Sequence, residues 1–374
     1  MTTFTRLDRS VVGRWWWTVD RWTLLAVALL LAMGGVMVLA ASPAVANTLR
    51  LDSFHFVKRQ FMYVPMAISV IFTVSLMSPL WVRRLAVVVF GICLILTLAT
   101  LLIGPEVKGA KRWIQLGSFT LQPTEFLKPT FAVVSAWMFA QQRKNDDIPG
   151  NLISMGLFVI VVTLLLLQPD VGMTLVVCAV WFAQFFLAGL PIFWVVLFLA
   201  VGIISAAGAY ALFPHVASRV DRFLDPSGAG NYQIDRAMEA FQRGGFFGVG
   251  PGDGSVKKVL PDAHTDFIFS VVGEEFGVLF CLVIVALFTF IVLRGFSRLL
   301  EEKNFFVVLA AAGLLTQFGL QAVINIGVNL RLMPTKGMTL PFVSYGGSSM
   351  LALALLMGML LAFSRRRAGS GEIK

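Results

Sequence analysis

Long blocks of apolar residues, separated by short polar segments, occupy most of the chain. A block of about 17 to 25 apolar residues is long enough to cross a bilayer as a helix. This criterion predicts ten spans, at 22–41, 61–77, 85–103, 124–140, 152–167, 171–187, 192–213, 267–293, 305–326 and 342–363. The pattern therefore predicts an all-α polytopic membrane protein in which residues 22–363 form one transmembrane domain. Ten spans place the terminal segments, 1–21 and 364–374, on the same side.

Composition and charge extend this picture. Of the 374 residues, 58% are hydrophobic and only 13% are charged, which is typical of a membrane protein. Lys and Arg gather on the side of the termini once the long segment 214–265 is set aside, so the positive-inside rule predicts cytoplasmic termini. The basic residues left on the exported side oppose that rule and indicate an anionic ligand there. Each of the three cysteines stands alone in an apolar span, so neither disulfides nor zinc are expected.

Three longer connections are expected on the exported side: 104–123, 214–265 and 327–341. The second contains apolar residues at helical spacing over 234–241, which predicts an amphipathic helix on or in the membrane surface. A glycine-rich segment follows at 244–254. It could bring backbone N–H groups close to an anion, and a flexible hinge that needs positive φ angles is the alternative.

The most informative stretch is 260–277, where a polar loop leads into an apolar span that carries Asp266, Glu274 and Glu275. A charged group inside a bilayer costs roughly 2.5 to 3.5 kcal/mol, so these carboxylates indicate a functional site. Asp266 is expected in the first helical turn, where it could cap the helix or, beside His264, act as a general base. Glu274 would lie about 12 Å deeper, which favours a structural role as the partner of a buried cation.

A second polar cluster begins the fourth predicted span, where Pro123 suits a first helical turn. Glu125 and Lys128 share a helix face at spacing i, i+3 and could simply form a structural pair. Together with Arg112 and Trp113, they could instead form a cationic, aromatic-edged mouth suited to a diphosphate and a sugar face.

The ninth predicted span carries an amide side chain at every fourth residue, namely Gln317, Gln321, Asn325 and Asn329. Interhelical hydrogen bonding explains such a stripe, and the wall of a polar cavity is the alternative. The segment that follows is rich in glycine and small hydroxyl residues, which allow close helix packing, and it contains a further candidate cation, Lys336.

Several of these motifs, in this order and spacing, resemble the SEDS family (shape, elongation, division and sporulation), polytopic glycosyltransferases that polymerise peptidoglycan. They are Lys-Arg-Trp-Ile-Gln-Leu-Gly at 111–117, Gln-Pro-Thr-Glu-Phe-Leu-Lys at 122–128, Leu-Pro-Asp-Ala-His-Thr-Asp-Phe-Ile-Phe at 260–269, Gly-Glu-Glu-Phe-Gly at 273–277 and the run from Pro-Thr-Lys-Gly to Ser-Tyr-Gly-Gly-Ser-Ser at 334–349. The resemblance covers almost the whole chain. The glycine-rich segment and the closing Ser-Tyr-Gly-Gly-Ser-Ser are more similar to the division-specific branch than to the elongation-specific branch.

The resemblance implies septal cell wall synthesis from lipid II, a disaccharide-pentapeptide on undecaprenyl diphosphate, at the exported face of the bacterial cytoplasmic (inner) membrane. It places the family's essential aspartate on Asp266, as the base for the acceptor sugar's 4-hydroxyl while the lipid diphosphate leaves with inversion. The other residues expected at the substrate are Lys111, Arg112, Trp113, Gln122, Glu125, Lys128, Arg243, Lys257, Lys258, His264, Lys336, Ser344 and Ser348. The residues expected to support them are Glu274, Glu275, Gln321 and Asn325.

The resemblance also implies partners: a class B penicillin-binding protein that supplies transpeptidation, other division proteins and membrane lipid, but no nucleic acid. No ligand cluster identifies a metal or other cofactor, although a divalent cation such as Mg²⁺ or Mn²⁺ could share the diphosphate charge. Two other functions stay open, a lipid II flippase and a non-catalytic scaffold of the division machinery. Against them, the charged motifs gather at the exported face alone, and a scaffold has no use for Asp266 beside a cationic mouth.

Overall fold

The computed structural model describes residues 10–48, 50–106, 109–117, 119–145, 147–189, 191–212, 217, 221, 232–334 and 337–365. The described chain is almost wholly helical. Its ten longest helices are α2 (Arg21–Thr48), α3 (His55–Ser75), α4 (Pro79–Ile103), α5 (Pro123–Lys144), α6 (Gly150–Leu167), α7 (Val171–Leu187), α8 (Ile192–Leu212), α11 (Ile268–Leu299), α12 (Phe305–Asn329) and α13 (Gly347–Phe363). The shorter elements are α1 (Val11–Thr18), α10 (Tyr232–Gly244), a 3₁₀ turn η1 (Val256–Lys258) and the hairpin strands β1 (Ile114–Leu116) and β2 (Phe119–Leu121).

Each predicted span falls on one of the ten long helices, which confirms the all-α polytopic fold class. Five of them, α2, α4, α6, α11 and α12, are long and apolar enough to cross a bilayer by length and composition, and α7 and α13 are shorter apolar helices. The protein is therefore a multi-pass membrane protein. That all ten helices cross the bilayer stays a prediction.

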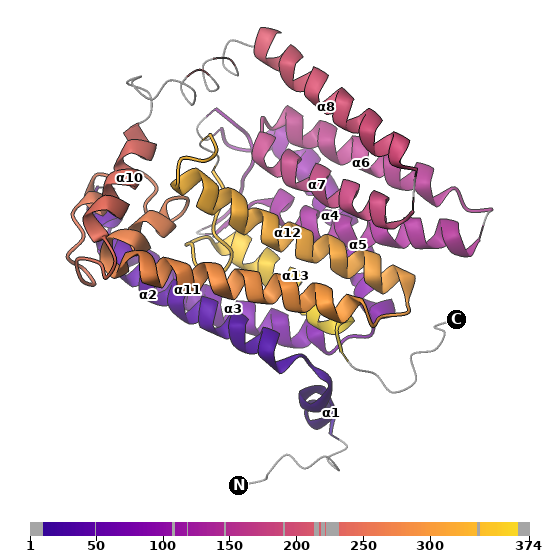
Figure 1. Cartoon of the computed structure of the whole chain (residues 1–374), viewed down its shortest axis with the longest axis horizontal. Coiled ribbons are helices and arrows are strands. Elements are labelled where there is room, and N and C mark those ends of the chain that lie inside the picture. The colour runs from indigo at the N-terminus through magenta and orange to yellow at the C-terminus, as the bar shows by residue number, and fades with distance from the viewer. Residues whose placement is uncertain are drawn as a thin grey trace.

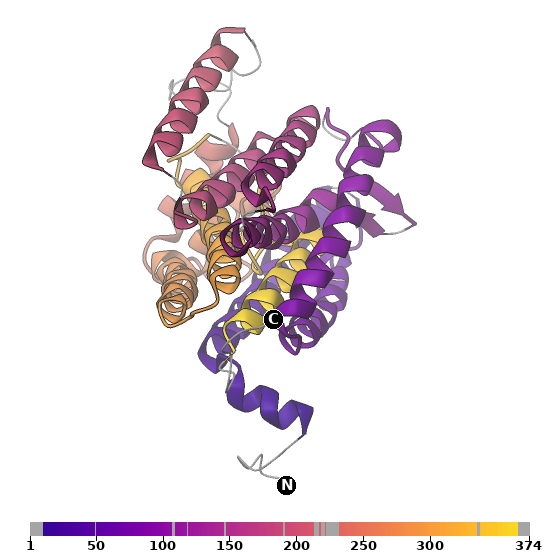
Figure 2. The ribbon, with the colours of Figure 1, turned by 90° about the vertical axis from the view of Figure 1, so that its right-hand side faces the viewer.

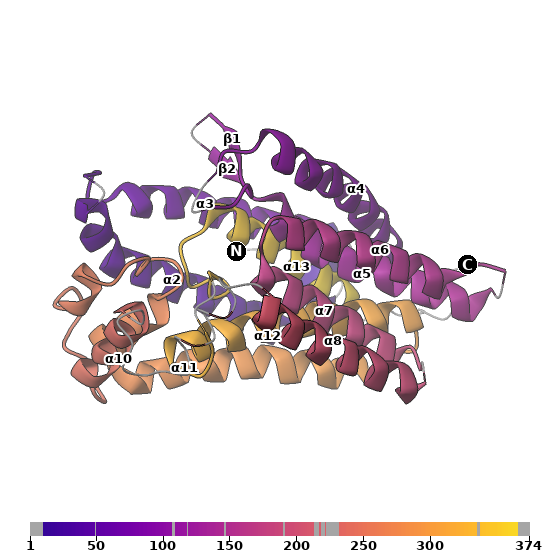
Figure 3. The same ribbon diagram turned by 90° about the horizontal axis from the view of Figure 1, so that it is seen from above.

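The long helices form an elongated bundle with α5, α12 and α13 at its centre and α8 at its periphery (Figures 1 and 2). Most residues of α5 and nearly every residue of α13 are buried. The hairpin and α10 lie towards one end of the bundle (Figure 3). At the other end α1 meets the end of α13, because Arg365 donates a hydrogen bond to Thr18 Oγ1 at 3.0 Å. The two ends of the described chain thus share one face.

An ion-pair cluster fastens this second end of the bundle. Asp20, just before α2, lies 2.8 Å from Arg294 and 2.9 Å from Arg298, both near the end of α11. Burial, the largest influence, would raise the Asp20 pKa. The hydrogen bonds from Arg294 and Thr23 and the nearby charges of the two arginines outweigh it, so the Asp20 pKa lies below its ordinary value of 3.8.

Two expectations about the elements met different outcomes. The amphipathic pattern forms α10 as predicted, and its buried face packs on α11, with the Phe241 and Phe269 ring centroids 5.8 Å apart; contact with the membrane surface stays a prediction. The expected start of the last span at residue 342 is wrong, because Phe342 adopts a left-handed φ of 63° and α13 begins only at Gly347. The residues between them form a turn that belongs to the candidate site.

Candidate active site

Asp266 lies at the mouth of the bundle, immediately before α11. The expectation that it occupies the first turn or caps the helix is wrong, because α11 begins at Ile268 and Phe267 holds the N-cap position. The Asp266 side chain is half-buried. A Cβ atom built on Gly337 would lie 3.3 Å from Asp266 Oδ2, so the carboxylate lies against the segment that follows α12. A side chain at residue 337 would push the carboxylate away by roughly a few tenths of an ångström.

The amide stripe of α12 holds the main chain of Asp266. Its carbonyl oxygen accepts hydrogen bonds from Asn325 Nδ2 and Asn329 Nδ2, both at 2.9 Å. Asn329 Oδ1 in turn accepts from the Ser270 N–H at 3.1 Å and from Ser270 Oγ at 2.6 Å, and Asn325 Nδ2 also donates to the Met338 carbonyl at 2.6 Å. Both asparagines are buried. Asn329 therefore makes the expected interhelical hydrogen bonds, to Ser270 of α11, whereas Asn325 bonds to the loops before α11 and after α12. Together the two asparagines hold the main chain of the carboxylate loop.

The turn before α13 clamps the other side of the same loop. Ser344 Oγ donates to the Thr265 carbonyl at 2.6 Å, and the Tyr345 N–H donates to the His264 carbonyl at 2.9 Å. The buried His264 ring forms a cluster with two aromatic rings that also contact each other: the centroid distances are 4.3 Å from His264 to Phe56, 5.5 Å from His264 to Tyr345 and 5.1 Å from Phe56 to Tyr345. Ser344 and His264, both expected at the substrate, are thus placed where they shape the loop around Asp266.

The predicted pair of Glu125 and Lys128 forms at 2.9 Å, with side chains only 6% and 2% exposed. Lys128 Nζ also lies 2.9 Å from Met173 Sδ and 3.5 Å from Gln321 Oε1. Gln321 Nε2 donates to the Thr339 carbonyl at 3.2 Å. This buried cation therefore joins α5, α7 and α12 to the segment that lies against Asp266.

Arg112 lies between the hairpin and the α6–α7 turn. It donates to the carbonyls of Gln168 at 2.9 Å and Pro169 at 2.7 Å, and it lies 3.3 Å from the Asp170 carboxylate. Its side chain remains 28% exposed. Lys111 is exposed and Trp113 is half-buried. Sequence reasoning missed Asp170, although an acidic residue directly before an apolar block is a typical N-cap signal, and Asp170 does cap α7.

Hydrogen bonds join strand β2 and the start of α5 to α13. Ser348 Oγ accepts a hydrogen bond from the Gln122 N–H at 3.1 Å and donates to the Thr120 carbonyl at 3.0 Å. Gln122 is buried, and Pro123 occupies the first turn of α5 as expected. Ser348 and Gln122 therefore lie in the joint between the hairpin and the bundle.

The glycine-rich loop and the turn that follows it at 255–257 do enclose anions, and they are the protein's own carboxylates. Glu274 accepts hydrogen bonds from the N–H groups of Ser255, Val256 and Lys257 at 2.7, 2.8 and 3.1 Å, and Glu275 accepts from the Gly252 N–H at 3.1 Å. The expectation that Glu274 pairs with a buried cation is wrong, since that partner belongs to Glu275, which forms an ion pair with Lys257 Nζ.

The positive φ angles of the alternative interpretation are present in that loop, whereas its role as a flexible hinge stays a prediction. Gly248 has a φ of 80°, and a Cβ atom on it would lie 2.1 Å from the Glu275 carbonyl oxygen. Lys257 is buried in its ion pair with Glu275. Arg243 and Lys258, in contrast, are exposed. Lys336 lies outside the described residues. Within the described ranges, no group of three or more His, Cys, Asp or Glu could hold a metal ion.

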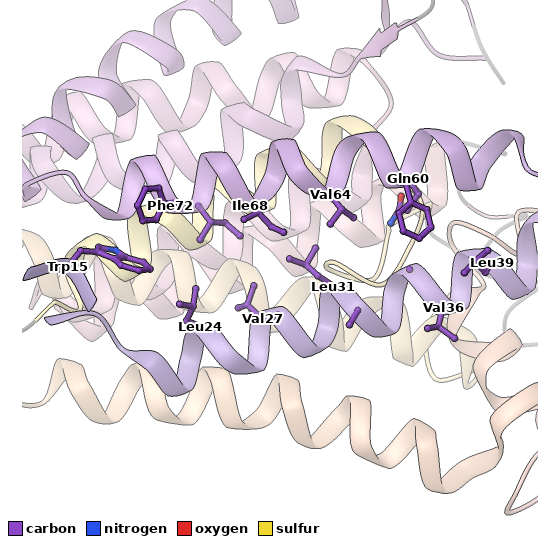
Figure 4. Close-up of a pocket in the computed structure, with 15 residues that line it drawn as sticks. Trp15, Leu24, Val27, Leu31, Val36, Leu39, Gln60, Val64, Ile68 and Phe72 are labelled. Carbon is purple, nitrogen blue, oxygen red and sulfur yellow. The ribbon is translucent and has the colours of Figure 1, made fainter. Parts of the chain in front are cut away.

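An apolar groove of about 480 Å³ runs between α2 and α3 (Figure 4). Trp15 and Phe72 lie at one end, and Gln60 lies near Val36 and Leu39 at the other. The Gln60 side chain is buried, and neither of its amide atoms has a hydrogen-bond partner among the described residues. Phe56, one helical turn before Gln60, packs against the His264 ring, so this end of the groove faces the Asp266 loop.

Comparisons with known proteins agree on one family. Residues 21–369 match the model of the FtsW, RodA and SpoVE family, described as cell cycle protein. A protein of Caulobacter vibrioides named probable peptidoglycan glycosyltransferase FtsW is 45% identical over 98% of this chain and 94% of its own length. A protein of the same name from Trichlorobacter lovleyi is 38% identical over 91% of this chain and 92% of its own.

Two solved structures share the fold. One, described as the structural coordination of polymerization and crosslinking by a peptidoglycan synthase complex, matches with a TM-score of 0.78 and 28% identity over 92% of this chain and 97% of the other. The other is the rod shape determining protein RodA of Thermus thermophilus. It matches with a TM-score of 0.67 and 27% identity over 93% of this chain and 97% of the other.

Proposed function

The chain belongs to the FtsW, RodA and SpoVE family of cell cycle proteins, and from that premise we infer that it is a peptidoglycan glycosyltransferase that builds septal glycan strands during cell division. The observation that carries this inference is the placement of Asp266. It is a half-buried carboxylate at the mouth of an apolar bundle, and two buried asparagines hold its main chain. A fixed carboxylate in this setting suits a general base.

We propose lipid II as the substrate. In the proposed step, Asp266 takes the proton of the acceptor sugar's 4-hydroxyl as that oxygen attacks the anomeric carbon of the donor. The bond from this carbon to the diphosphate breaks, and the lipid diphosphate leaves with the bonding electrons. Attack opposite the leaving group inverts the anomeric carbon. The partial exposure of the side chain supports this role, because a substrate hydroxyl can reach a carboxylate that is not fully buried.

The leaving diphosphate gains charge, and positive groups near it would lower the barrier. Arg112 is the best placed of the described candidates, because it is held by Asp170 while its side chain stays partly exposed. Exposed Lys111, Arg243 and Lys258 can reach a ligand from solvent. Lys128 is buried in its ion pair with Glu125, so it would not touch the diphosphate and could influence it only by long-range electrostatics. Mg²⁺ or Mn²⁺ could join through the diphosphate oxygens, since Mg²⁺ is usually held partly by substrate phosphates.

The groove between α2 and α3 supports a lipid-linked substrate. Its lining is almost wholly apolar, which suits an isoprenoid chain. The Gln60 amide lies where the chain would approach the Asp266 loop and could donate to the first polar group of the lipid. An apolar chain alone would leave that amide without a partner, at a cost of about 1 to 3 kcal/mol.

We also propose a class B penicillin-binding protein as partner, in the septal part of the bacterial cytoplasmic membrane, with both termini cytoplasmic. The solved relative that couples polymerization to crosslinking supports such a partner. The meeting of α1 with the end of α13 supports termini on one side. Other division proteins are further proposed partners. A lipid II flippase and a non-catalytic scaffold are the alternative functions, and the test described next distinguishes them from a polymerase.

The test is polymerisation of labelled lipid II by purified protein, with and without the cognate penicillin-binding protein, with glycans resolved by length. Asp266→Asn should abolish glycan formation while the protein stays folded. Asp253→Asn, an exposed carboxylate of the glycine-rich loop, is the matched control and should polymerise as the wild type does. Polymerisation by Asp266→Asn would remove Asp266 as the base. A folded, partner-bound wild type that makes no glycan would redirect the proposal to lipid transport or scaffolding.

A further inference from the structure

A second pocket lies at the end of the bundle opposite Asp266. It occupies about 480 Å³ between the start of α4, the end of α5 and the start of α12. Asn304 and Phe305, at the start of α12, line it, whereas Asn325, which holds Asp266, lies twenty residues along the same helix. At about 1.5 Å per residue the two sites are roughly 30 Å apart, about the thickness of a bilayer core. The pocket therefore opens at the other membrane face.

The lining of this pocket is cationic. Arg83, Arg143 and Lys144 belong to it, and no acidic residue is among the described residues that line it. The guanidinium of Arg83 lies 4.9 Å from the ring centroid of Trp137, and that of Arg143 lies 4.4 Å from the ring centroid of Phe305. Stacking of this kind orients a guanidinium. The two arginines are thus held against aromatic rings in a pocket whose described lining contains no carboxylate.

Two further features add to the positive character of this pocket. The Trp137 Nε1 atom is buried and has no hydrogen-bond partner among the described residues, although a buried indole N–H normally finds one. The helices α4 and α12 both begin at the pocket, where α5 ends, so the positive ends of two helix dipoles lie there against the negative end of one. A ligand that accepts hydrogen bonds and carries negative charge would satisfy each of these groups.

We propose that this pocket binds the phosphate group of an anionic ligand at the cytoplasmic face. Arginine forks match phosphate oxygens, and basic pockets between membrane helices on this side are typical sites for anionic lipid head groups. The apolar side chains of Leu80 and Phe306 in the same lining would lie against the acyl chains of a lipid. A soluble phosphate could supply the same chemistry, and the two sources can be separated by experiment.

The experiment measures phosphate binding to the purified full-length protein by native mass spectrometry, with phosphatidylglycerol, phosphatidylcholine or inorganic pyrophosphate added in turn. The double variant Arg83→Gln with Arg143→Gln should lose about 30-fold in affinity for phosphatidylglycerol, since each basic residue near an anionic lipid counts for about a factor of five. Arg84→Gln is the matched control, because Arg84 is exposed, stacks on Trp81 and does not line the pocket.

Each outcome bears on the proposal. A selective loss of phosphatidylglycerol binding in the double variant assigns the site to a lipid head group, and a selective loss of pyrophosphate binding assigns it to a soluble phosphate. Equal binding by the double variant, the control and the wild type overturns the proposal. If the double variant fails to fold, Lys144→Gln, an exposed lining residue, should still lose about fivefold. The readout is binding alone, so it is independent of glycan polymerisation.

Discussion

The two asparagines that hold Asp266 should contribute unequally to folding and to catalysis. The Asn329 side chain makes four hydrogen bonds of 3.1 Å or shorter: its amide group donates to the carbonyls of Asp266 and Asn325, and its oxygen accepts two from Ser270. Asn325 donates to the carbonyls of Asp266 and Met338. At about 0.6 to 1 kcal/mol per buried hydrogen bond, Asn329→Ala should lower the free energy of unfolding by about 2 to 4 kcal/mol, and Asn325→Ala by about half as much.

Both substitutions should also slow polymerisation beyond what the fraction of folded protein explains. Each removes one of the two hydrogen bonds that hold the main-chain carbonyl of Asp266, the proposed base. Thermal unfolding in detergent gives the stability, and lipid II polymerisation at a temperature where all variants are folded gives the rate. We expect kcat to fall while KM stays close to the wild-type value. The contacts of both asparagines are with the protein's own main chain and with Ser270, so neither is expected to bind the substrate.

Gln317→Met is the matched control on the same stripe. Gln317 is buried, and its amide oxygen has no hydrogen-bond partner among the described residues, so the substitution should be close to neutral in stability and rate. The reasoning is refuted if Gln317→Met is as damaging as Asn329→Ala, or if both asparagine variants retain wild-type kcat when fully folded.

Three further predictions concern buried charges. Lys257→Met removes the cation of a buried ion pair and should destabilise the protein by about 3 to 5 kcal/mol, seen as faster proteolysis within residues 245–258; the exposed neighbour Lys258→Met should leave proteolysis unchanged. Lys128→Met should cost a similar amount in thermal unfolding, and adding Glu125→Gln should restore much of it; no recovery would argue that the pair is not the main contribution. The Asp20 pKa is lowered in the folded state, so its stabilising contribution is present above pH 3.8 and is lost as the pH falls below that value; Asp20→Asn should flatten this acid limb of the unfolding profile, and an unchanged limb would contradict the assignment.

The groove between α2 and α3 bears on how a lipid-linked substrate would reach Asp266. Its Gln60 end faces the carboxylate loop through the contact of Phe56 with His264. The cationic pocket at the other end of the bundle is separated from that loop by the length of α12. We therefore expect the two proposed sites to bind independently, so that a defect in one leaves binding at the other unchanged.

The sequence by itself determined the helices and the position of the candidate base. Apolar blocks of bilayer length predicted all ten long helices, since burial along a helix is a local property of consecutive residues. The spacing of apolar residues predicted α10 as well. Asp266 was identifiable because a carboxylate at the edge of an apolar block is costly unless it serves a purpose.

Only the tertiary structure decided which polar groups meet. Asp266 is held by Asn325, 59 residues away, and the Gln122 N–H bonds to Ser348, 226 residues away. The anions enclosed by the glycine-rich loop and the turn after it are Glu274 and Glu275, although the sequence alone allowed an external ligand equally well. The physical reason is that hydrophobic periodicity depends only on residues close together in the sequence. The partner of a buried polar group depends instead on how helices distant in the sequence pack.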